Sequence, residues 1–354
     1  MKAKNLKDAY KAFYPTPLEE AGAVESFYIK RGDGLVKLFS TFGDDSIKVL
    51  FSGQRGTGKT TELNYTETAL ASKYTILNLK IGKYLSTPLT NSQDISIAIL
   101  TATAQDLKLK ESLGDISFVI KRLLNIKRNY ISVINDALEE IKKKTGKSVL
   151  LFIDDLDKGI HRVDKILSEE GGLFTQIACS LALVVPIKTI YSGMAIRDWF
   201  SHVEVLPIIP IINKNGERYA PGLNMLKELV FRRMESGLIT DKSLELAAEY
   251  SGGVFRYLVK IIQESAFNAL QADKDHITED NVWSSIKNMQ SEFGRIIGIG
   301  DYDKLNYIRK KKNLINIEAD VRYIENDIVL EYQNDSRWVD IHPVVKDLLP
   351  RDKP

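Results

Sequence analysis

Residues 47–61 of this 354-residue chain are Ile47-Lys48-Val49-Leu50-Phe51-Ser52-Gly53-Gln54-Arg55-Gly56-Thr57-Gly58-Lys59-Thr60-Thr61. The apolar residues before the first glycine include β-branched ones and predict a buried strand. The residues from about Thr60 to Leu70 predict a helix. Between strand and helix, the pattern G-x-x-x-x-G-K-[ST] is matched at all its fixed positions, by Gly53, Gly58, Lys59 and Thr60. This order predicts a phosphate-binding loop.

A triphosphate requires residues of these types. The glycines permit positive-φ turns, so consecutive backbone N–H groups can surround the β-phosphate. Lys59 would reach the β- and γ-phosphates, Thr60 would bind Mg²⁺, and the helix would direct its positive end at the anion. A glycine-rich turn without a ligand is the alternative, and the strand before it and the helix after it argue against that. The predicted nucleotide contacts are Gly53, Gln54, Arg55, Gly56, Thr57, Gly58, Lys59, Thr60 and Thr61.

Composition sets the broad class of the protein. Hydrophobic residues make up 44% and charged residues 27%, as in ordinary globular proteins, and the net charge is +2. This balance does not by itself indicate a nucleic-acid or membrane partner. The single cysteine, Cys179, excludes an internal disulfide and suits a reducing cytoplasm. The N-terminal residues lack a signal core, and Leu181–Ile190 is too short to span a bilayer, so we expect a cytoplasmic protein without a membrane partner.

Acidic residues follow a second apolar strand. Ser148–Ile153 is nearly all apolar, as expected for a central parallel strand, and it runs into Asp154 and Asp155. Downstream of a phosphate loop, this is where a carboxylate would support Mg²⁺. We assign Asp154 to Mg²⁺ and Asp155 to the attacking water. A capped loop is the alternative explanation for two acids here, and Asp157 is assigned only to capping the next turn.

Further strands are predicted at Tyr74–Ile81, Leu183–Tyr191 and Val203–Pro210. Helices are predicted at Ile95–Leu107, at Ile116–Leu124 and around residues 131–141. Five strands separated by helices indicate an α/β sandwich with a parallel sheet. Before it, Ala23–Phe39 suggests an extended piece, a turn and a short amphipathic helix, which would lie against adenine or only pack. Ser192, after the fourth strand, would sense the γ-phosphate or simply start a turn.

After Pro221 the pattern becomes helical, and Ser251-Gly252-Gly253-Val254-Phe255-Arg256 precedes a long helix. Arg256 would contact the nucleotide, or it would be an exposed helical arginine. Near the C-terminus, a helix with basic residues 309–312, a hairpin around residues 333–337 and a short last helix suit a winged-helix-like module. Such a module binds DNA through basic residues, here Arg309–Lys312 and Arg337, or docks proteins. The predicted division is an N-terminal segment (1–45), a P-loop core (46–215), a helical lid (216–294) and this module (295–354).

Together these residues resemble the AAA+ ATPases and their relatives, the signal-transducing ATPases with numerous domains (STAND). The resemblance covers about residues 25–290. Gly53–Thr60 matches Walker A, Leu150–Asp155 matches Walker B, Ser192 lies at the sensor 1 position, and Ser251–Arg256 looks like sensor 2. The lid pattern is similar to that of origin-recognition-type initiators and transposon ATPases. The phosphate-loop context also resembles ATPases of bacterial mobile-element and phage-defence operons.

Two departures from this family pattern bear on activity. Most AAA+ members have Glu after the Walker B Asp, whereas this chain has Asp155, as the STAND relatives do. A shorter carboxylate holds water less well, so we expect slow turnover. The segment Ile196–Phe200 resembles the one that carries an arginine finger, yet Trp199 stands at the arginine position, and Arg197 is the candidate substitute.

The sequence therefore predicts a switch that binds and slowly hydrolyses ATP with Mg²⁺. It would act in mobile-element DNA transactions or phage defence, as a homo-oligomer or with a partner protein encoded nearby, and would contact duplex DNA through the C-terminal module. The alternative is a nucleotide-bound adaptor with little hydrolysis that recruits an effector. A small-molecule kinase is disfavoured by the large lid and the lack of an evident second substrate pocket.

Overall fold

The structure is a computed structural model that describes residues 2–19, 21–32, 34–80, 96, 99, 103, 130–156, 167–169, 171–191 and 196–350. Its contacts divide the chain into two compact units. The sheet unit comprises Lys30–Ser52 and Lys59–Leu206, and the lid unit comprises Met1–Ile29, Gly53–Gly58 and Pro207–Pro354. These units are defined by packing, and each joins segments that are distant in the sequence. They therefore do not test the four-part division expected from the sequence, which stays a prediction.

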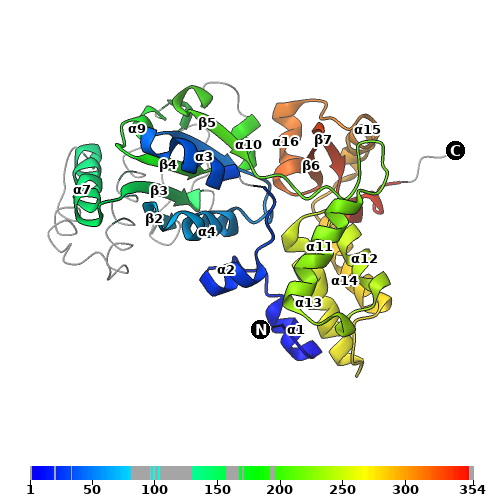
Figure 1. Ribbon diagram of the computed structural model, residues 1–354. Coiled ribbons are helices and arrows are strands. Elements are labelled where there is room, and N and C mark those ends of the chain that lie inside the picture. The colour runs from blue at the N-terminus through cyan, green and yellow to red at the C-terminus, as the bar shows by residue number, and fades with distance from the viewer. Residues whose placement is uncertain are drawn as a thin grey trace. The chain divides into compact units, whose positions relative to one another are not determined.

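The sheet unit contains a five-stranded sheet in the order β2-β3-β4-β1-β5. All four strand pairs are parallel. The predicted parallel α/β fold is thus confirmed, with the helices flanking the sheet in Figure 1. The strands are β1 (Lys48–Ser52), β2 (Tyr74–Lys80), β3 (Ser148–Asp154), β4 (Ser180–Val184) and β5 (His202–Val205).

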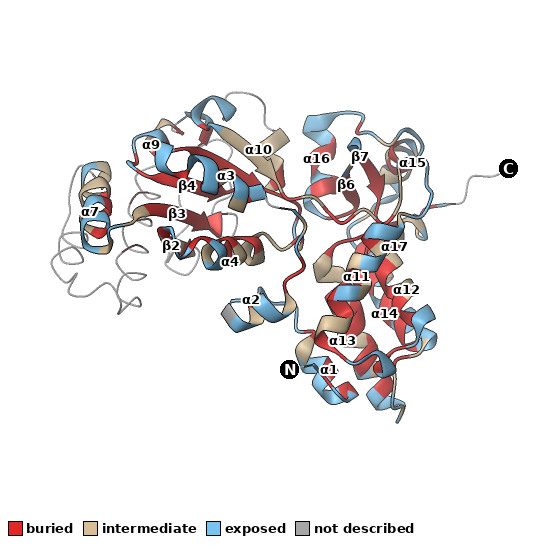
Figure 2. Cartoon of the chain, in the orientation of Figure 1, coloured by how far each residue is buried: buried red, intermediate tan, exposed pale blue. Residues whose placement is uncertain are grey.

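Alternate residues of the central strands enter two different cores. Leu50, Leu151 and Leu183 belong to one core, which also contains residues of α7 (Tyr130–Thr145). Their neighbours along the strands, including Phe51 and Phe152, belong to the other, with residues of α3 (Gly34–Phe42) and α4 (Lys59–Leu70). Side chains alternate between the faces of a strand, so a sheet covered on both sides reads as a continuous apolar run. Figure 2 shows these strands as buried.

The structure corrects three local predictions. The strand expected over Leu183–Tyr191 is β4 ending at Val184, followed by helix α10 (Ile187–Tyr191). Pro186 separates them because proline cannot donate to a strand ladder and suits the beginning of a helix. The fifth strand ends at Val205 rather than Pro210. The expected extended piece before the turn is helix α2 (Ala21–Phe27).

The remaining elements among the described residues of the sheet unit are short: η1 (Gly43–Asp45), α9 (Gly172–Thr175) and η5 (Arg197–Trp199). The predicted helix Ile116–Leu124 lies outside the described residues. So does Ile95–Leu107, except at positions 96, 99 and 103. Across the described part of the chain, no helix is both long and apolar enough to cross a membrane.

The lid unit is mainly helical. It contains α11 (Ala220–Arg233), α12 (Asp241–Tyr250), α13 (Phe255–Gln271) and α14 (Glu279–Gly294), which confirm the predicted helical region, with η6 (Ser236–Leu238) between α11 and α12. The N-terminal helix α1 (Leu6–Ala12) packs on α13. Arg233 lies near the rings of Phe13 and Phe27, so both N-terminal and lid residues contribute to this unit.

The C-terminal module, residues 295–350, belongs to the lid unit. It contains η7 (Ile299–Asp301), α15 (Tyr302–Lys311), α16 (Ile317–Glu325), β6 (Val329–Asn334), β7 (Ser336–Ile341) and α17 (Pro343–Lys346). The antiparallel pair β6–β7 confirms the predicted hairpin, and it turns at Asp335, whose φ is +60°. Helix α16 was not predicted. Asn316 caps it, and the buried Asp320 carboxylate accepts from the backbone N–H groups of Ile315 and Asn316.

Candidate nucleotide-binding site

The predicted phosphate loop, Gly53–Gly58, lies in the lid unit. Gly56 and Gly58 have φ values of +84° and +94°, which non-glycine residues rarely adopt. A Cβ on Gly56 would lie 2.6 Å from Cβ of Arg256, so the loop approaches another segment too closely for a side chain there. Backbone conformation therefore favours glycine at both positions, and close packing requires it at Gly56.

Arg256, the predicted sensor 2 residue, lies beside this loop. Its backbone N–H donates to the Gly56 carbonyl at 3.2 Å, and it lies in the first turn of α13. The preceding Gly252 and Gly253 have φ values of +63° and +82°. A Cβ on Gly253 would lie 1.8 Å from the Ile209 carbonyl oxygen. The structure thus brings the predicted lid arginine and the phosphate loop together within one unit, through backbone contacts that depend on glycine.

The two predicted Mg²⁺ residues, Thr60 and Asp154, lie together in the sheet unit. Thr60 is in the first turn of α4, and its hydroxyl donates to Oδ2 of Asp154 at 2.7 Å. Asp154 ends β3 and is buried. A hydroxyl and a carboxylate at this separation supply hard oxygen atoms, which are the ligands that Mg²⁺ prefers. Among the described residues, no group of three or more His, Cys, Asp and Glu side chains is arranged to hold a metal ion.

Asp155, assigned to the attacking water, has an unusual backbone. It is buried and has a φ of +69°, in the left-handed region. Its backbone N–H donates to Oδ1 of Asp154 at 2.8 Å. Uncommon backbone conformations of non-glycine residues often occur at functional sites, where surrounding contacts maintain them. Here the side chain of Asp154 bonds Thr60 through one oxygen and stabilises the turn at Asp155 through the other.

The remaining predicted residues are placed as follows. Lys59 begins α4, and Thr61 lies in its first turn. Ser192 and Asp157 lie outside the described residues. Arg197 is exposed, and its guanidinium donates to the Ile190 carbonyl at 3.4 Å. Arg55 is also exposed, whereas Thr57 is buried and its hydroxyl donates to the Gln54 carbonyl at 2.9 Å.

The structure also shows a charged cluster in the sheet unit that sequence reasoning missed. Glu62, on α4, is buried, and its carboxylate lies 3.8 Å from the Arg31 guanidinium. Burial, together with the nearby Glu62 carboxylate, raises the pKa of Glu204. A Cβ on Gly34 would lie 2.9 Å from Glu204, so the chain passes close to this carboxylate. The sequence signal for this cluster was Glu62 itself, a charged residue in the first turn of a helix that contributes other residues to the core.

Comparison with solved structures finds chains that are similar to this one over nearly its whole length. Cdc6p from Pyrobaculum aerophilum is 13% identical, with a TM-score of 0.50 and coverage of 96% of this chain and 98% of that one. The ORC2 protein of Aeropyrum pernix, solved as ADPNP–ADP complexes, is 11% identical, with a TM-score of 0.51 and coverage of 95% of each chain. The RuvB Holliday junction branch migration motor of Thermotoga maritima is 15% identical, with a TM-score of 0.44 and coverage of 95% and 98%.

No protein-family model and no curated protein matches this sequence. The fold of the Cdc6 and ORC structures is nevertheless shared over nearly the whole chain. The structural neighbours are AAA+ P-loop ATPases, and the protein has the AAA+ fold. This result agrees with the resemblance that the Walker motifs indicated, while the identities are low enough that it concerns the fold alone.

Proposed function

We propose that this chain is a molecular switch that binds ATP with Mg²⁺ and hydrolyses it slowly. The observation that carries the proposal is the hydrogen bond between Thr60 and Asp154, because it joins the two motifs that would serve the same ion. The position of Arg256 beside Gly56 supports it further. In this proposal the loop residues Gly53–Gly58 direct their N–H groups at the phosphates, and Lys59 neutralises phosphate charge.

Bound Mg²⁺ would offset charge on the phosphate oxygens during transfer to water. Thr60 and Asp154 are the residues assigned to hold it, and Asp155 is assigned to orient the attacking water. An aspartate reaches less far than the glutamate of most AAA+ enzymes, which is the reason to expect slow turnover. Arg256, in the first turn of α13, would couple nucleotide state to the helical lid and so to assembly or partner binding.

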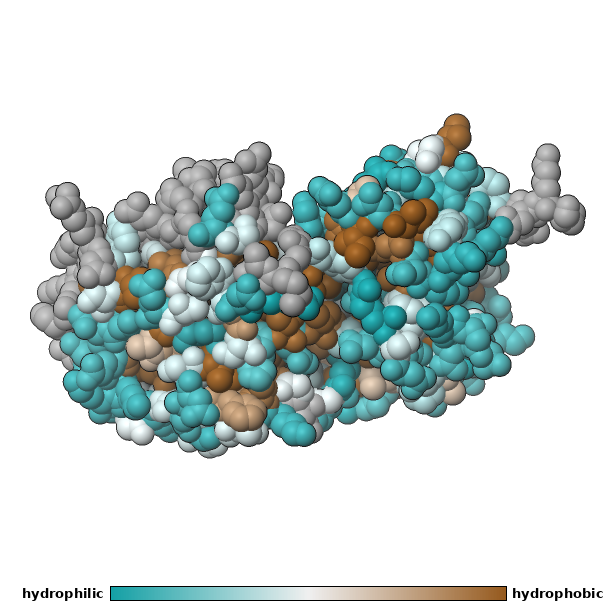
Figure 3. Space-filling model, turned by 90° about the horizontal axis from the view of Figure 1, so that it is seen from above, coloured by the Kyte–Doolittle hydropathy of each residue, from teal (hydrophilic) through white to brown (hydrophobic). Residues whose placement is uncertain are grey.

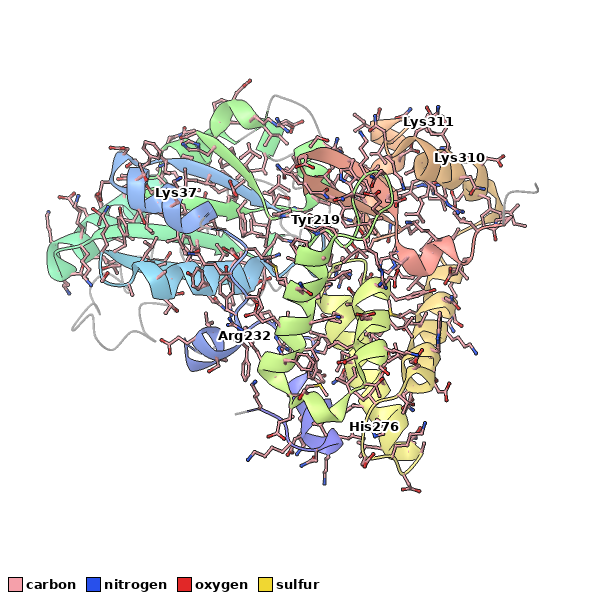
Figure 4. The ribbon with its side chains drawn as sticks, turned by 45° about the vertical axis from the view of Figure 1, so that its right-hand side comes forward. Lys37, Tyr219, Arg232, His276, Lys310 and Lys311 are labelled. Atoms are coloured by element: carbon pink, nitrogen blue, oxygen red, sulfur yellow. The ribbon has the colours of Figure 1, made fainter. Side chains whose placement is uncertain are left out.

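A DNA-binding role is proposed for the basic end of α15. Arg309, Lys310 and Lys311 are exposed, and Figure 4 shows the two lysines extending from the helix. Two other predicted cations are engaged within the module: Lys312 pairs with Asp340 at 2.7 Å, and Arg337 pairs with Glu331 at 2.7 Å. The observation that supports the proposed DNA contact is the exposure of Arg309–Lys311. A mobile-element or phage-defence setting rests on the resemblance of the phosphate loop alone.

The second candidate is a nucleotide-bound adaptor that hydrolyses little and recruits an effector protein. One observation favours it: large apolar side chains are exposed on the C-terminal module, with Ile299 at 84%, Ile315 at 52% and Ile317 at 54% exposure. Figure 3 shows brown hydrophobic residues among teal hydrophilic ones on the visible face of the molecule. Where exposed apolar side chains form a contiguous patch, they are typical of protein-docking surfaces.

The steady-state ATPase rate tests these proposals. Wild type and Asp155→Ala are compared with and without duplex DNA at low salt, where phosphate contacts are strongest. A low rate that DNA stimulates, and that Asp155→Ala abolishes, supports the DNA-coupled switch. Nucleotide binding with no measurable hydrolysis, unchanged by DNA, supports the adaptor. Absence of nucleotide binding overturns both.

A further inference from the structure

The side chain of Gln54, in the phosphate loop, is buried in contacts with the C-terminal module. Its amide nitrogen donates to the carbonyls of Ile324 at 3.0 Å and Val329 at 2.9 Å. Its amide oxygen accepts from the backbone N–H of Glu331 at 2.6 Å. Gln54 is only 2% exposed. A single side chain thus bonds three backbone groups at the end of α16 and along β6.

These contacts satisfy backbone groups that the hairpin leaves available. Ile324 lies at the end of α16, and its carbonyl also accepts from the Asp327 N–H at 3.2 Å, so Gln54 adds a second bond there. In β6, which pairs only with β7 in the described sheet, the Val329 carbonyl and the Glu331 N–H both meet Gln54. Gln54 therefore takes the place of a neighbouring strand. Loss of this side chain would remove the bonds of these two β6 groups to Gln54, which is costly for buried backbone.

Two further contacts tie the same part of the module to the segment around Arg256. The hydroxyl of Tyr257 donates to Oδ2 of Asp327 at 3.0 Å, and Asp327 occupies the turn between α16 and β6 with a φ of +56°. The hydroxyl of Tyr332 donates to the Gly252 carbonyl at 2.9 Å. The module is thus bonded both to the phosphate loop, through Gln54, and to the segment around Arg256, through Tyr257 and Gly252. All these contacts lie within the lid unit.

We propose that Gln54 couples nucleotide binding to the attachment of the C-terminal module, so that the attached module holds the phosphate loop ready for nucleotide. This inference rests on the proposed nucleotide-binding function and names its regulation. Gln54 is a positioning residue: its side chain is used by the module, while its backbone stays in the loop, where its carbonyl accepts from the Thr57 hydroxyl. An effector that detaches the module would release the loop and weaken nucleotide binding.

Thermodynamic coupling is reciprocal, and this gives two independent readouts. Nucleotide affinity is measured by calorimetry with Mg²⁺–ADP, which carries the β-phosphate that the loop would bind. Attachment of the module is measured by hydrogen–deuterium exchange of β6, since the amide of Glu331 donates directly to Gln54. In wild type, Mg²⁺–ADP should slow exchange in β6.

The test variant is Gln54→Ala. We expect exchange in β6 to accelerate without nucleotide, and ADP binding to weaken about tenfold, within the roughly 5- to 150-fold range typical of coupled sites. Addition of ADP should then protect β6 less than in wild type. Tyr257→Phe removes the hydroxyl that bonds Asp327 with a smaller disturbance, and should change both readouts in the same direction by a smaller factor.

Gln290→Ala is the matched control. Gln290 also donates to the module, through the Asp347 carboxylate at 3.3 Å, but this bond is solvent-exposed, so its loss should loosen the module little. It should leave ADP affinity unchanged. Wild type that binds no ADP overturns the proposed function and this coupling with it. Wild type that binds ADP, with Gln54→Ala and Tyr257→Phe binding equally tightly, overturns the coupling alone.

Discussion

The Thr60 hydroxyl donates to the Asp154 carboxylate at 2.7 Å, although the two residues are 94 positions apart in the sequence. Each residue belongs to a motif that could occur by chance. Because β1 and β3 both pair in parallel with β4, their carboxyl ends lie at one edge of the sheet, and the helix after the loop begins beside the acid. The hydrogen bond therefore joins the phosphate-loop motif and the acidic motif after β3. Each motif is an independent sequence signal, and neither alone specifies the fold that brings them together.

Thr60→Ala should remove one proposed Mg²⁺ ligand without disturbing α4, since alanine has the best helix propensity. We expect Mg²⁺-dependent ATP hydrolysis to fall by about tenfold or more, which corresponds to about 1.4 kcal/mol of barrier. The measurement is the hydrolysis rate as a function of Mg²⁺ concentration. Thr68→Ala is the control, because Thr68 lies on the same helix and its hydroxyl bonds only the Asn64 carbonyl there. Equal Mg²⁺ dependence in both variants would contradict the assignment.

Gly253→Ala should destabilise the lid unit strongly. The added Cβ would lie 1.8 Å from the Ile209 carbonyl oxygen, and the φ of +82° is unfavourable for alanine. We expect a loss of roughly 3 kcal/mol in the free energy of unfolding, since left-handed strain alone costs about 1–3 kcal/mol. Gly237→Ala is the control, because an added Cβ there meets nothing within 4 Å. Chemical denaturation measures both, and similar midpoints for the two variants would show that the close approach is not maintained.

The elements of the sheet unit that were predicted well are those whose residues are buried on both faces. β3 was predicted to within one residue, because every position from Val149 to Asp154 is buried and the apolar run leaves little alternative. The strand after Cys179 was placed poorly, since apolar residues continue through Pro186 into α10 and the run alone does not separate strand from helix. Proline was the signal that should have ended the strand.

The sequence indicates the candidate site where phosphate chemistry fixes the spacing of residues, but not where tertiary contacts bring residues together. Gly53 to Thr60 follow a pattern set by phosphate geometry, so the sequence alone indicated them. The side-chain contacts of Gln54 join residues up to 277 positions apart, and no local pattern encodes them. The same holds for Arg31 and Glu204, which approach Glu62 through the fold.

Cys179 should be chemically inert in the folded protein. It is 6% exposed, and burial raises the pKa of its thiol to about 12, so the reactive thiolate is scarce at pH 8. We expect modification by a thiol reagent to be at least about a hundredfold slower than in denaturant, following the thiolate fraction and access. As the only cysteine, it reports unfolding of the sheet unit alone. Rapid labelling under native conditions would contradict the buried placement.

His342 should make the lid unit sensitive to acid. The imidazole is buried, Nδ1 accepts from the Val344 N–H at 3.2 Å, and burial lowers its pKa from 6.5 to about 3. The unfolded chain then binds a proton that the folded chain does not. Stability contributed by neutral His342 is therefore complete above about pH 6.5 and declines as the pH falls towards 3, by about 1.4 kcal/mol per pH unit at most.

His342→Asn isolates this effect, because asparagine can also cap α17 but does not titrate. The measurement is the urea midpoint of wild type and variant between pH 7 and pH 4. We expect wild type to lose more stability than His342→Asn over this range. Parallel curves would mean that the folded protein binds the proton after all.

The central claim is that residues 53–60 bind nucleotide, and calorimetric titration with Mg²⁺ and a non-hydrolysable ATP analogue tests it most directly. Wild type and Lys59→Ala are compared with Lys143→Ala, an exposed lysine that pairs with Glu139 on α7. We predict that wild type and Lys143→Ala bind with the same affinity and that Lys59→Ala binds at least about tenfold more weakly, because a charge-assisted phosphate contact is lost. Equal affinity in Lys59→Ala, or no binding by wild type, would contradict the claim.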